Sequence, residues 1–264
     1  MSEEIPEQAV PCDIVAFVAH PDDAELYVGG TLALAKEQGH RTAIVDFTRG
    51  ELSTRGNLES RAAETAAASR TLGLSCRVNL DLPDGHLRDN DESRLAVVKT
   101  LREMRPSVVL ASPIDDHHAD HMAAGIIVKR SVYLSGVRKY GPTDLEPWRP
   151  NTLLHYVGTH AAVPDCIVDI SSVFETRDAA IRCYQSQFFG ADSTSVGNPR
   201  TELGDGGQQS TRIALPEFME WMNGRARHFG MLIGASYGEA FTSDHPIPIS
   251  RPVDIFGRSA WENR

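Results

Sequence analysis

The chain has 264 residues, with 36 acidic against 26 basic side chains, so its formal net charge is −10 at pH 7. This excess of negative charge argues against a nucleic-acid-binding surface, because phosphate contacts need clustered lysine and arginine. No run approaches the roughly eighteen apolar residues that a membrane-spanning helix needs, so we expect no membrane partner. The N-terminal residues are acidic and polar and lack the features of a signal peptide, which predicts a cytoplasmic protein.

The first part of the chain alternates short apolar runs with helical patterns. Strands are predicted over 14–19, 41–48, 75–80 and 107–112. Helices are predicted between them, over 24–38, 58–72 and 91–104. This order with short connections predicts an α/β fold, a doubly wound and mostly parallel sheet with helices on both faces. In such sheets ligands bind at the carboxyl ends of the strands, where we expect the active site.

The second part of the chain continues the same alternation. The predicted elements are a helix over 119–134, strands over 151–159 and 166–170, and helices over 173–188 and 216–231. A polar loop over 190–212 is long enough to form a lid or an oligomer contact. Phe218, Met219, Trp221 and Met222 in the last helix are interpreted as packing residues. Residues 246–264 are predicted to form an extended tail. No linker divides the chain, so residues 1–264 are expected to form a single domain.

The first predicted strand ends directly at His20, Pro21, Asp22 and Asp23. A histidine and two adjacent carboxylates therefore lie at the carboxyl end of a buried strand. Imidazole and carboxylate together are a ligand set that suits zinc. The alternative interpretation is that Asp22 or Asp23 only caps the following helix, but a cap needs a single carboxylate. The pair beside a histidine favours a metal site.

A second polar cluster follows the fourth predicted strand and holds three of the ten histidines of the chain. It reads Asp115, Asp116, His117, His118, Ala119, Asp120, His121. His118 and His121 are three positions apart at the start of a predicted helix, so their side chains can face the same point. The alternative is a solvated acidic loop with incidental histidines. Because both clusters follow strands of one parallel sheet, we expect one crevice to collect them.

Three protein ligands and one open position are typical of a catalytic zinc site. The ligands predicted here are His20, Asp23 and His121. Zinc would lower the pKa of a water at the open position toward about 7, and Asp22 is placed to take the proton of that water. His118, held by Asp120, could stabilise an oxyanion or protonate a leaving amine. These groups favour amide hydrolysis over redox chemistry or phosphoryl transfer, which need a nucleotide-binding motif or a phosphate cradle.

The segment AHPDDAE at residues 19–25, together with HADH at residues 118–121, resembles the paired motif of the LmbE-like (PIG-L) zinc-dependent N-acetylglucosamine deacetylases. The resemblance implies a Rossmann-like fold, a Zn²⁺ cofactor with Fe²⁺ as the alternative, and a homo-oligomer, either a trimer or a hexamer. It implies the same roles for the site residues: the zinc ligands His20, Asp23 and His121, the general base Asp22, and His118 and Asp120 acting on the transition state.

Further motifs extend the resemblance over roughly residues 12–245 and are similar to the bacillithiol-biosynthesis branch, which deacetylates N-acetylglucosaminyl malate. These motifs are TRGELSTRG, ESRAAE, NLDLPDG, RKYGP, YQSQF and YGEAF. In that branch the residues matching Arg61 and Tyr237 line the substrate pocket. Arg49 and Arg55 are further candidates to contact an anion.

Two positions depart from the family pattern. Ala119 stands where the family usually has proline, and His117 stands where close relatives often have arginine, which bears on carboxylate recognition. The substrate could instead be another N-acetylglucosaminide or a chitooligosaccharide. A non-catalytic sugar-binding relative would have lost the base or a ligand, and the chain retains both. A glycosidase would use Asp22 or Asp23 with a distant acid and would need no metal.

Overall fold

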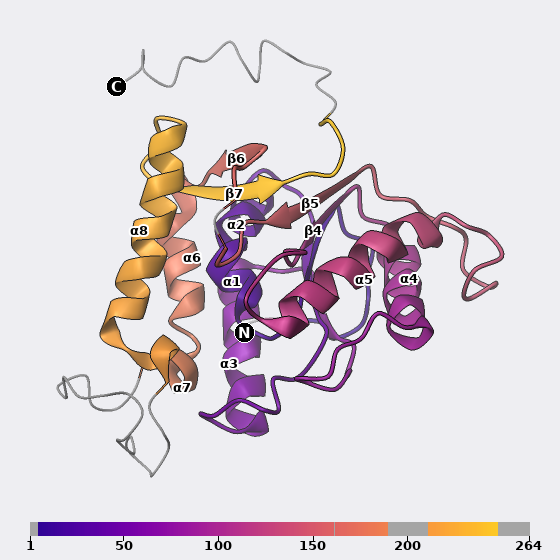
Figure 1. Cartoon of the computed structure of the whole chain (residues 1–264), viewed down its shortest axis with the longest axis horizontal. Helices are drawn as coiled ribbons and strands as arrows, with labels where there is room; N and C mark the ends of the chain where they lie inside the picture. The colour runs from indigo at the N-terminus through magenta and orange to yellow at the C-terminus, as the bar shows by residue number, and fades with distance from the viewer. Residues whose placement is uncertain (1–4, 161, 190–210, 248–264) are drawn as a thin grey trace.

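The computed structural model describes residues 5–160, 162–189 and 211–247, and the strands of this part of the chain form one seven-stranded sheet (Figure 1). The strands are β1 (Ile14–Val18), β2 (Thr42–Asp46), β3 (Cys76–Asn79), β4 (Val108–Ala111), β5 (Thr152–Tyr156), β6 (Cys166–Asp169) and β7 (Gly238–Thr242). Their order in the sheet is β3-β2-β1-β4-β5-β7-β6. The loop predicted over 190–212 and the tail predicted over 246–264 lie outside the described residues, apart from 211–212 and 246–247.

The five strands from β3 to β5 run parallel, and β7 lies antiparallel between β5 and β6. The predicted fold class, a mostly parallel sheet in an α/β fold, is confirmed. The sequence did not predict β7. This strand begins with Gly238 and the buried carboxylate of Glu239, which do not form the apolar pattern of a strand.

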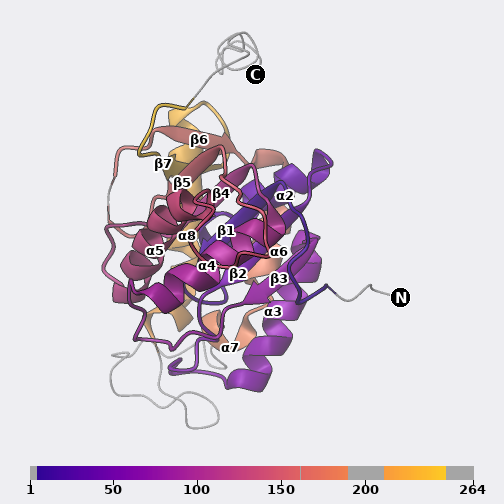
Figure 2. The ribbon, with the colours of Figure 1, turned by 90° about the vertical axis from the view of Figure 1, so that its right-hand side faces the viewer.

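Helices cover both faces of the sheet (Figure 2). Their bounds are α1 (Asp23–Tyr27), α2 (Gly29–Glu37), α3 (Leu58–Leu72), α4 (Asp91–Met104), α5 (Ala119–Ser135), α6 (Phe174–Ile181), α7 (Gln185–Phe188) and α8 (Pro216–Leu232). Successive side chains of β1 point to opposite faces. Val15 and Phe17 pack in the core beneath α4 and α5, and Ala16 and Val18 pack in the core beneath α2, α6 and α8. The central strand is therefore buried on both sides, as its apolar sequence indicates.

The helix predicted over 24–38 is divided into α1 and α2 at Val28. A Cβ atom at Gly30 would lie 2.8 Å from the side chain of Ile170, so glycine permits the close approach of the second helix. The carboxylate of Glu239 accepts hydrogen bonds from the backbone N–H groups of Gly30 and Thr31, at 2.8 and 2.7 Å. These N–H groups have no partner within the helix, so Glu239 takes the place of a cap. The helix predicted over 173–188 is likewise divided, into α6 and α7.

Within the described ranges, every helix is too short or too polar to span a bilayer. The expected single domain, the trimer or hexamer and the cytoplasmic location stay predictions.

Candidate metal centre and active site

The two polar clusters meet at the carboxyl edge of the sheet. β1 and β4 are parallel neighbours, with Phe17 opposite Ala111. The segment after β1 carries His20, and the segment after β4 leads to His121 in the first turn of α5. Because parallel strands end at the same edge, clusters that are about a hundred residues apart in the sequence face one another. The predicted common crevice is present.

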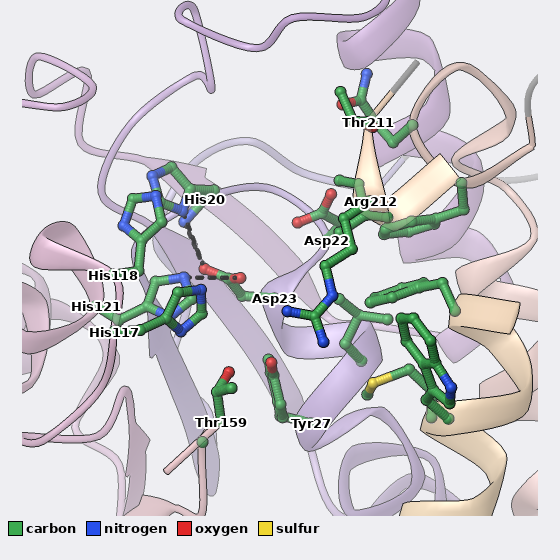
Figure 3. A pocket seen from close by; sticks show the side chains of 18 of the residues that line it. His20, Asp22, Asp23, Tyr27, His117, His118, His121, Thr159, Thr211 and Arg212 are labelled. Atoms are coloured by element: carbon green, nitrogen blue, oxygen red, sulfur yellow. Dashed lines mark hydrogen bonds and ion pairs between the residues drawn. The ribbon is translucent and has the colours of Figure 1, made fainter. Parts of the chain in front are cut away.

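The carboxylate of Asp23 lies between two imidazole rings (Figure 3). Its Oδ2 atom is 3.3 Å from Nδ1 of His20, and its Oδ1 atom is 3.2 Å from Nε2 of His121. The backbone N–H of His20 donates a hydrogen bond to the same Oδ2 at 2.9 Å. All three side chains are largely buried. The structure thus brings the three predicted ligands together.

A further carboxylate lies on the far side of each of these rings. Nδ1 of His121 is 3.4 Å from Asp116, while Nε2 of His20 is 3.1 Å from Asp84 and 3.5 Å from Asp120. Burial lowers the pKa of His121, but the charge of Asp23 and the contact with the Asp116 carboxylate outweigh it and raise this pKa to about 9. Carboxylates in this position orient metal-binding histidines and increase their basicity. The sequence analysis assigned no role to Asp84 or Asp116.

The donors at this centre fit a divalent cation. Two imidazoles and one carboxylate are ligands that both zinc and non-haem iron accept, so the set is compatible with either metal. The ring nitrogens of His20, His118 and His121 also lie within 4.8 Å of one another, and His20 lies equally close to carboxylate oxygens of Asp84 and Asp120. His20 is therefore common to each possible ligand set.

Asp22 is held beside the predicted ligands in an unusual backbone conformation. Its φ angle is 110°, in a region that residues other than glycine rarely adopt. Backbone strain of this kind is typical of functional positions. Its carboxylate accepts a hydrogen bond from Nη2 of Arg61 at 3.0 Å. Burial raises the pKa of Asp22 to about 7, and the positive charge of Arg61 opposes this rise. A carboxylate with this pKa can accept a proton and return it at neutral pH.

The contacts of Asp120 differ from the expectation. Nδ1 of His118 accepts a hydrogen bond from the backbone N–H of Asp120 at 3.2 Å. The carboxylate of Asp120 instead accepts hydrogen bonds from the backbone N–H groups of Gly85 and Leu87, at 2.6 and 3.2 Å. The carboxylate thus anchors the turn that carries Asp84, while the backbone orients His118. In the neutral ring, an accepting Nδ1 leaves the proton on Nε2.

The ligand cluster opens into a pocket of about 1020 Å³. Arg55 and Arg61 line it, and their contacts with a substrate stay predictions. Tyr237 does not line it, because its ring is stacked on Phe174 with ring centroids 3.5 Å apart. Arg49 also lies outside the lining and forms an exposed ion pair with Asp81 at 2.7 Å. Tyr237 and Arg49 therefore lie outside the pocket lining, and their expected substrate contacts stay predictions.

The far wall of the pocket comes from α7, α8 and the 3₁₀ turn Arg212–Ala214. Met219 and Met222 pack in a core cluster with Phe218 against it, as interpreted from the sequence. Phe218, Trp221 and Met222 also line the pocket, which the sequence did not predict. Arg212 and Arg225 line the same wall, and the sequence analysis missed both. The signal that could have revealed this wall is the pairing of large apolar residues with arginines along one helix.

The α/β fold and the histidine and carboxylate cluster at the carboxyl edge of its sheet form a candidate metal site of the kind that metal-dependent hydrolases use. The chain matches the family model "PIG-L: GlcNAc-PI de-N-acetylase" over residues 15–132. It is 30% identical over 227 residues to 1D-myo-inositol 2-acetamido-2-deoxy-alpha-D-glucopyranoside deacetylase 2 of Saccharopolyspora erythraea, covering 64% of this chain and 81% of the relative. The chain belongs to the PIG-L family.

Other relatives differ in their activities. The chain is 29% identical over 189 residues to diacetylchitobiose deacetylase of Thermococcus kodakarensis, covering 66% of this chain and 70% of that protein. It is 27% identical over 189 residues to 4-oxalmesaconate hydratase of Pseudomonas putida, covering 64% of this chain and 71% of that protein. The crystal structure of the conserved protein TT1542 from Thermus thermophilus superposes with a TM-score of 0.78 at 38% identity, covering 90% of this chain and 97% of that one.

Proposed function

We propose that the protein is a metal-dependent deacetylase that hydrolyses the N-acetyl group of an N-acetylglucosamine conjugate. The observation that carries the proposal is the position of the Asp23 carboxylate between His20 and His121, with Asp22 beside it at the base of a large pocket. Two of the relatives described above are deacetylases of N-acetylated glucosamine compounds, which supports the N-acetyl amide bond as the bond that is hydrolysed.

In this proposal His20, Asp23 and His121 hold a zinc or iron ion. When bound, such an ion polarises the acetyl carbonyl and lowers the pKa of water. Asp22 accepts a proton from the attacking water and returns it to the amide nitrogen as the C–N bond breaks. Acetic acid and the free amine are then released.

His118 stabilises the negative charge that develops on the carbonyl oxygen. Its Nδ1 atom accepts the backbone hydrogen bond of Asp120, so the neutral ring carries its proton on Nε2 and can donate it in a hydrogen bond. Burial lowers the pKa of His118, which favours this neutral form. Of the two roles left open by the sequence, stabilisation of the oxyanion therefore has more support than protonation of the amine.

The proposed substrate is N-acetylglucosaminyl malate, as in the bacillithiol-type branch of the family. The sequence motifs that resemble this branch support it, and the pocket has room for an aglycone beyond the sugar. The relatives named above make a chitooligosaccharide the alternative substrate and hydration of an unsaturated acid the alternative reaction.

The test is release of acetate by the zinc- or iron-loaded protein from N-acetylglucosaminyl malate, N,N'-diacetylchitobiose and free N-acetylglucosamine. The expected result is acetate in an amount equal to the new amine, with the glycosidic bond intact and the malate conjugate cleaved fastest. Release of free malate would indicate a glycosidase. No acetate from any substrate would contradict the proposal.

A further inference from the structure

The pocket has two chemically different ends. Among the described residues that line it, the carboxylates are those of Asp22, Asp23 and Asp84, and all three lie at the metal end. The opposite wall, from α8 and the turn before it, contributes the guanidinium groups of Arg212 and Arg225 and no carboxylate. In a chain of net charge −10, a wall of positive charge inside a pocket indicates a site for an anion.

Arg225 is fixed in place by its neighbours. Its guanidinium carbon lies 5.1 Å from the centre of the Tyr27 ring and 4.9 Å from the centre of the Phe229 ring. Its Nη2 atom donates a hydrogen bond to the carbonyl of Val157. Within the described ranges, no carboxylate lies within ion-pair distance of Arg225. Because a guanidinium has five N–H donors, this fixed group retains others for a ligand.

Arg212 is the second cation of this wall. Its guanidinium carbon lies 5.1 Å from the centre of the Trp221 ring, and Figure 3 shows its side chain reaching into the pocket opposite the histidines. Arg212 likewise forms no ion pair with any carboxylate in the part of the chain that the structure describes. Stacking on the indole supports the side chain without using its N–H groups.

The arginines that the sequence analysis favoured already have partners. Arg61 donates hydrogen bonds to the carboxylate of Asp22 and to the carbonyl of Pro21. Arg49 is paired with Asp81, and Arg55 donates to the carbonyl of Ser186. Recognition of an anionic aglycone by Arg61 or Arg49 would require breaking an ion pair, and Arg55 is buried. Among the described residues, Arg212 and Arg225 have no carboxylate partner to give up.

We infer that Arg212 and Arg225 form the subsite that binds a carboxylate-bearing aglycone, with the acetyl group of the same substrate at the metal end. The inference rests on the proposed deacetylase function and names the residues that select the substrate class. Guanidinium groups bind carboxylates through two parallel hydrogen bonds, so two arginines suit a dicarboxylate such as malate. Phe218 and Met222 contribute apolar surface to the same wall.

The experiment compares kcat/KM for acetate release from N-acetylglucosaminyl malate, N,N'-diacetylchitobiose and methyl N-acetylglucosaminide. It uses the metal-loaded wild type, Arg212→Gln, Arg212→Lys and Arg225→Gln. Arg149→Gln is the matched control, because Arg149 also lies over an aromatic ring, that of Tyr133, and donates to a backbone carbonyl, but lies outside the pocket lining.

The kcat/KM of the wild type is expected to be about tenfold or more higher for the malate conjugate than for either neutral substrate. A hydrogen bond to a charged group stabilises binding by about this factor. Arg212→Gln and Arg225→Gln should each reduce that ratio by about tenfold, mainly through KM, and Arg149→Gln should leave it unchanged. Arg212→Lys should retain part of the preference, because it keeps the charge and loses the bidentate geometry. The preference should also decrease as salt is added.

Two results would overturn the inference while leaving the deacetylase in place: equal cleavage of charged and neutral substrates by the wild type, or an equal loss on all three substrates in Arg212→Gln. Arg212 is exposed, so its variants test the inference even if Arg225→Gln does not fold. No acetate from any of the three substrates would instead contradict the proposed function.

Discussion

Arg61 donates a hydrogen bond from Nη2 to the carboxylate of Asp22 at 3.0 Å, and both side chains are buried. The same nitrogen also contacts the carbonyl of Pro21, so Arg61 holds the backbone and the side chain of the proposed general base. A residue in this position affects the chemical step for every substrate. Besides lining the pocket, as the resemblance implies, Arg61 therefore positions the proposed general base.

Arg61→Ala is expected to lower kcat by about tenfold or more on free N-acetylglucosamine and on the malate conjugate alike. The physical reason is that Asp22 would lose its buried hydrogen-bond partner and its orientation. Steady-state kinetics on both substrates measures the effect, with Arg49→Ala as the control because Arg49 pairs with Asp81 outside the pocket. A change confined to KM for the malate conjugate would assign Arg61 to the aglycone instead.

The two adjacent carboxylates, Asp22 and Asp23, are expected to have different functions. Asp22→Asn is expected to keep the metal and lower kcat by about 10²-fold or more, the effect of losing a general base. Asp23→Asn should weaken metal binding, because this carboxylate contacts both histidines. Metal analysis and kinetics on both variants measure the difference. If Asp22→Asn lost the metal and Asp23→Asn retained it, the two roles would be reversed.

His121→Ala should lose the metal. We expect about one divalent ion per wild-type chain, because the candidate donor groups found among the described residues share His20. Elemental analysis of the purified protein and the variant tests this expectation, and His40→Ala is a suitable control since His40 is exposed and distant from the cluster. A full complement of metal in His121→Ala would exclude His121 as a ligand.

His118→Ala should lower kcat by about 10²- to 10³-fold with little change in metal content, as for the loss of an oxyanion-stabilising donor. The measurement pairs turnover with metal analysis of the same preparation. The ring nitrogens of His118, His20 and His121 lie within 4.8 Å of one another, so His118 is also placed to be a metal ligand. The metal content of the variant decides between that role and stabilisation of the oxyanion. Loss of the ion would make His118 a ligand, and wild-type turnover would leave it without a catalytic role.

Asp116→Asn is expected to weaken metal binding by about 10- to 100-fold, the usual effect of losing a carboxylate behind a ligating histidine. Asp116 is buried, faces Nδ1 of His121 at 3.4 Å, and accepts backbone hydrogen bonds from His118 and Thr159. Competition with a chelator measures the metal affinity directly. Asp115→Asn is the control, since the neighbouring Asp115 is exposed. Equal affinities in the two variants would contradict a positioning role for Asp116.

The sequence by itself determined the parallel strands and the two ligand clusters. Apolar runs such as 14–19 and 107–112 reveal buried strands, because a strand covered on both faces has few polar residues. Each cluster lies directly after such a run, so its position at the carboxyl edge of the sheet follows from chain order alone. The chemical types of the donors, imidazole and carboxylate, are likewise readable without a structure.

Only the tertiary structure decided which partners the polar side chains have. Glu239 caps α2 across 209 positions of sequence, and Arg225 reaches the carbonyl of Val157 across 68. The same applies to Asp120, whose carboxylate holds a turn 35 positions away rather than the nearby ring of His118. Local patterns encode burial and periodicity, which repeat along a strand or a helix. A single hydrogen bond between distant segments leaves no such repeat, so the wall of the pocket and the residues that orient the histidines emerged only when the chain was folded.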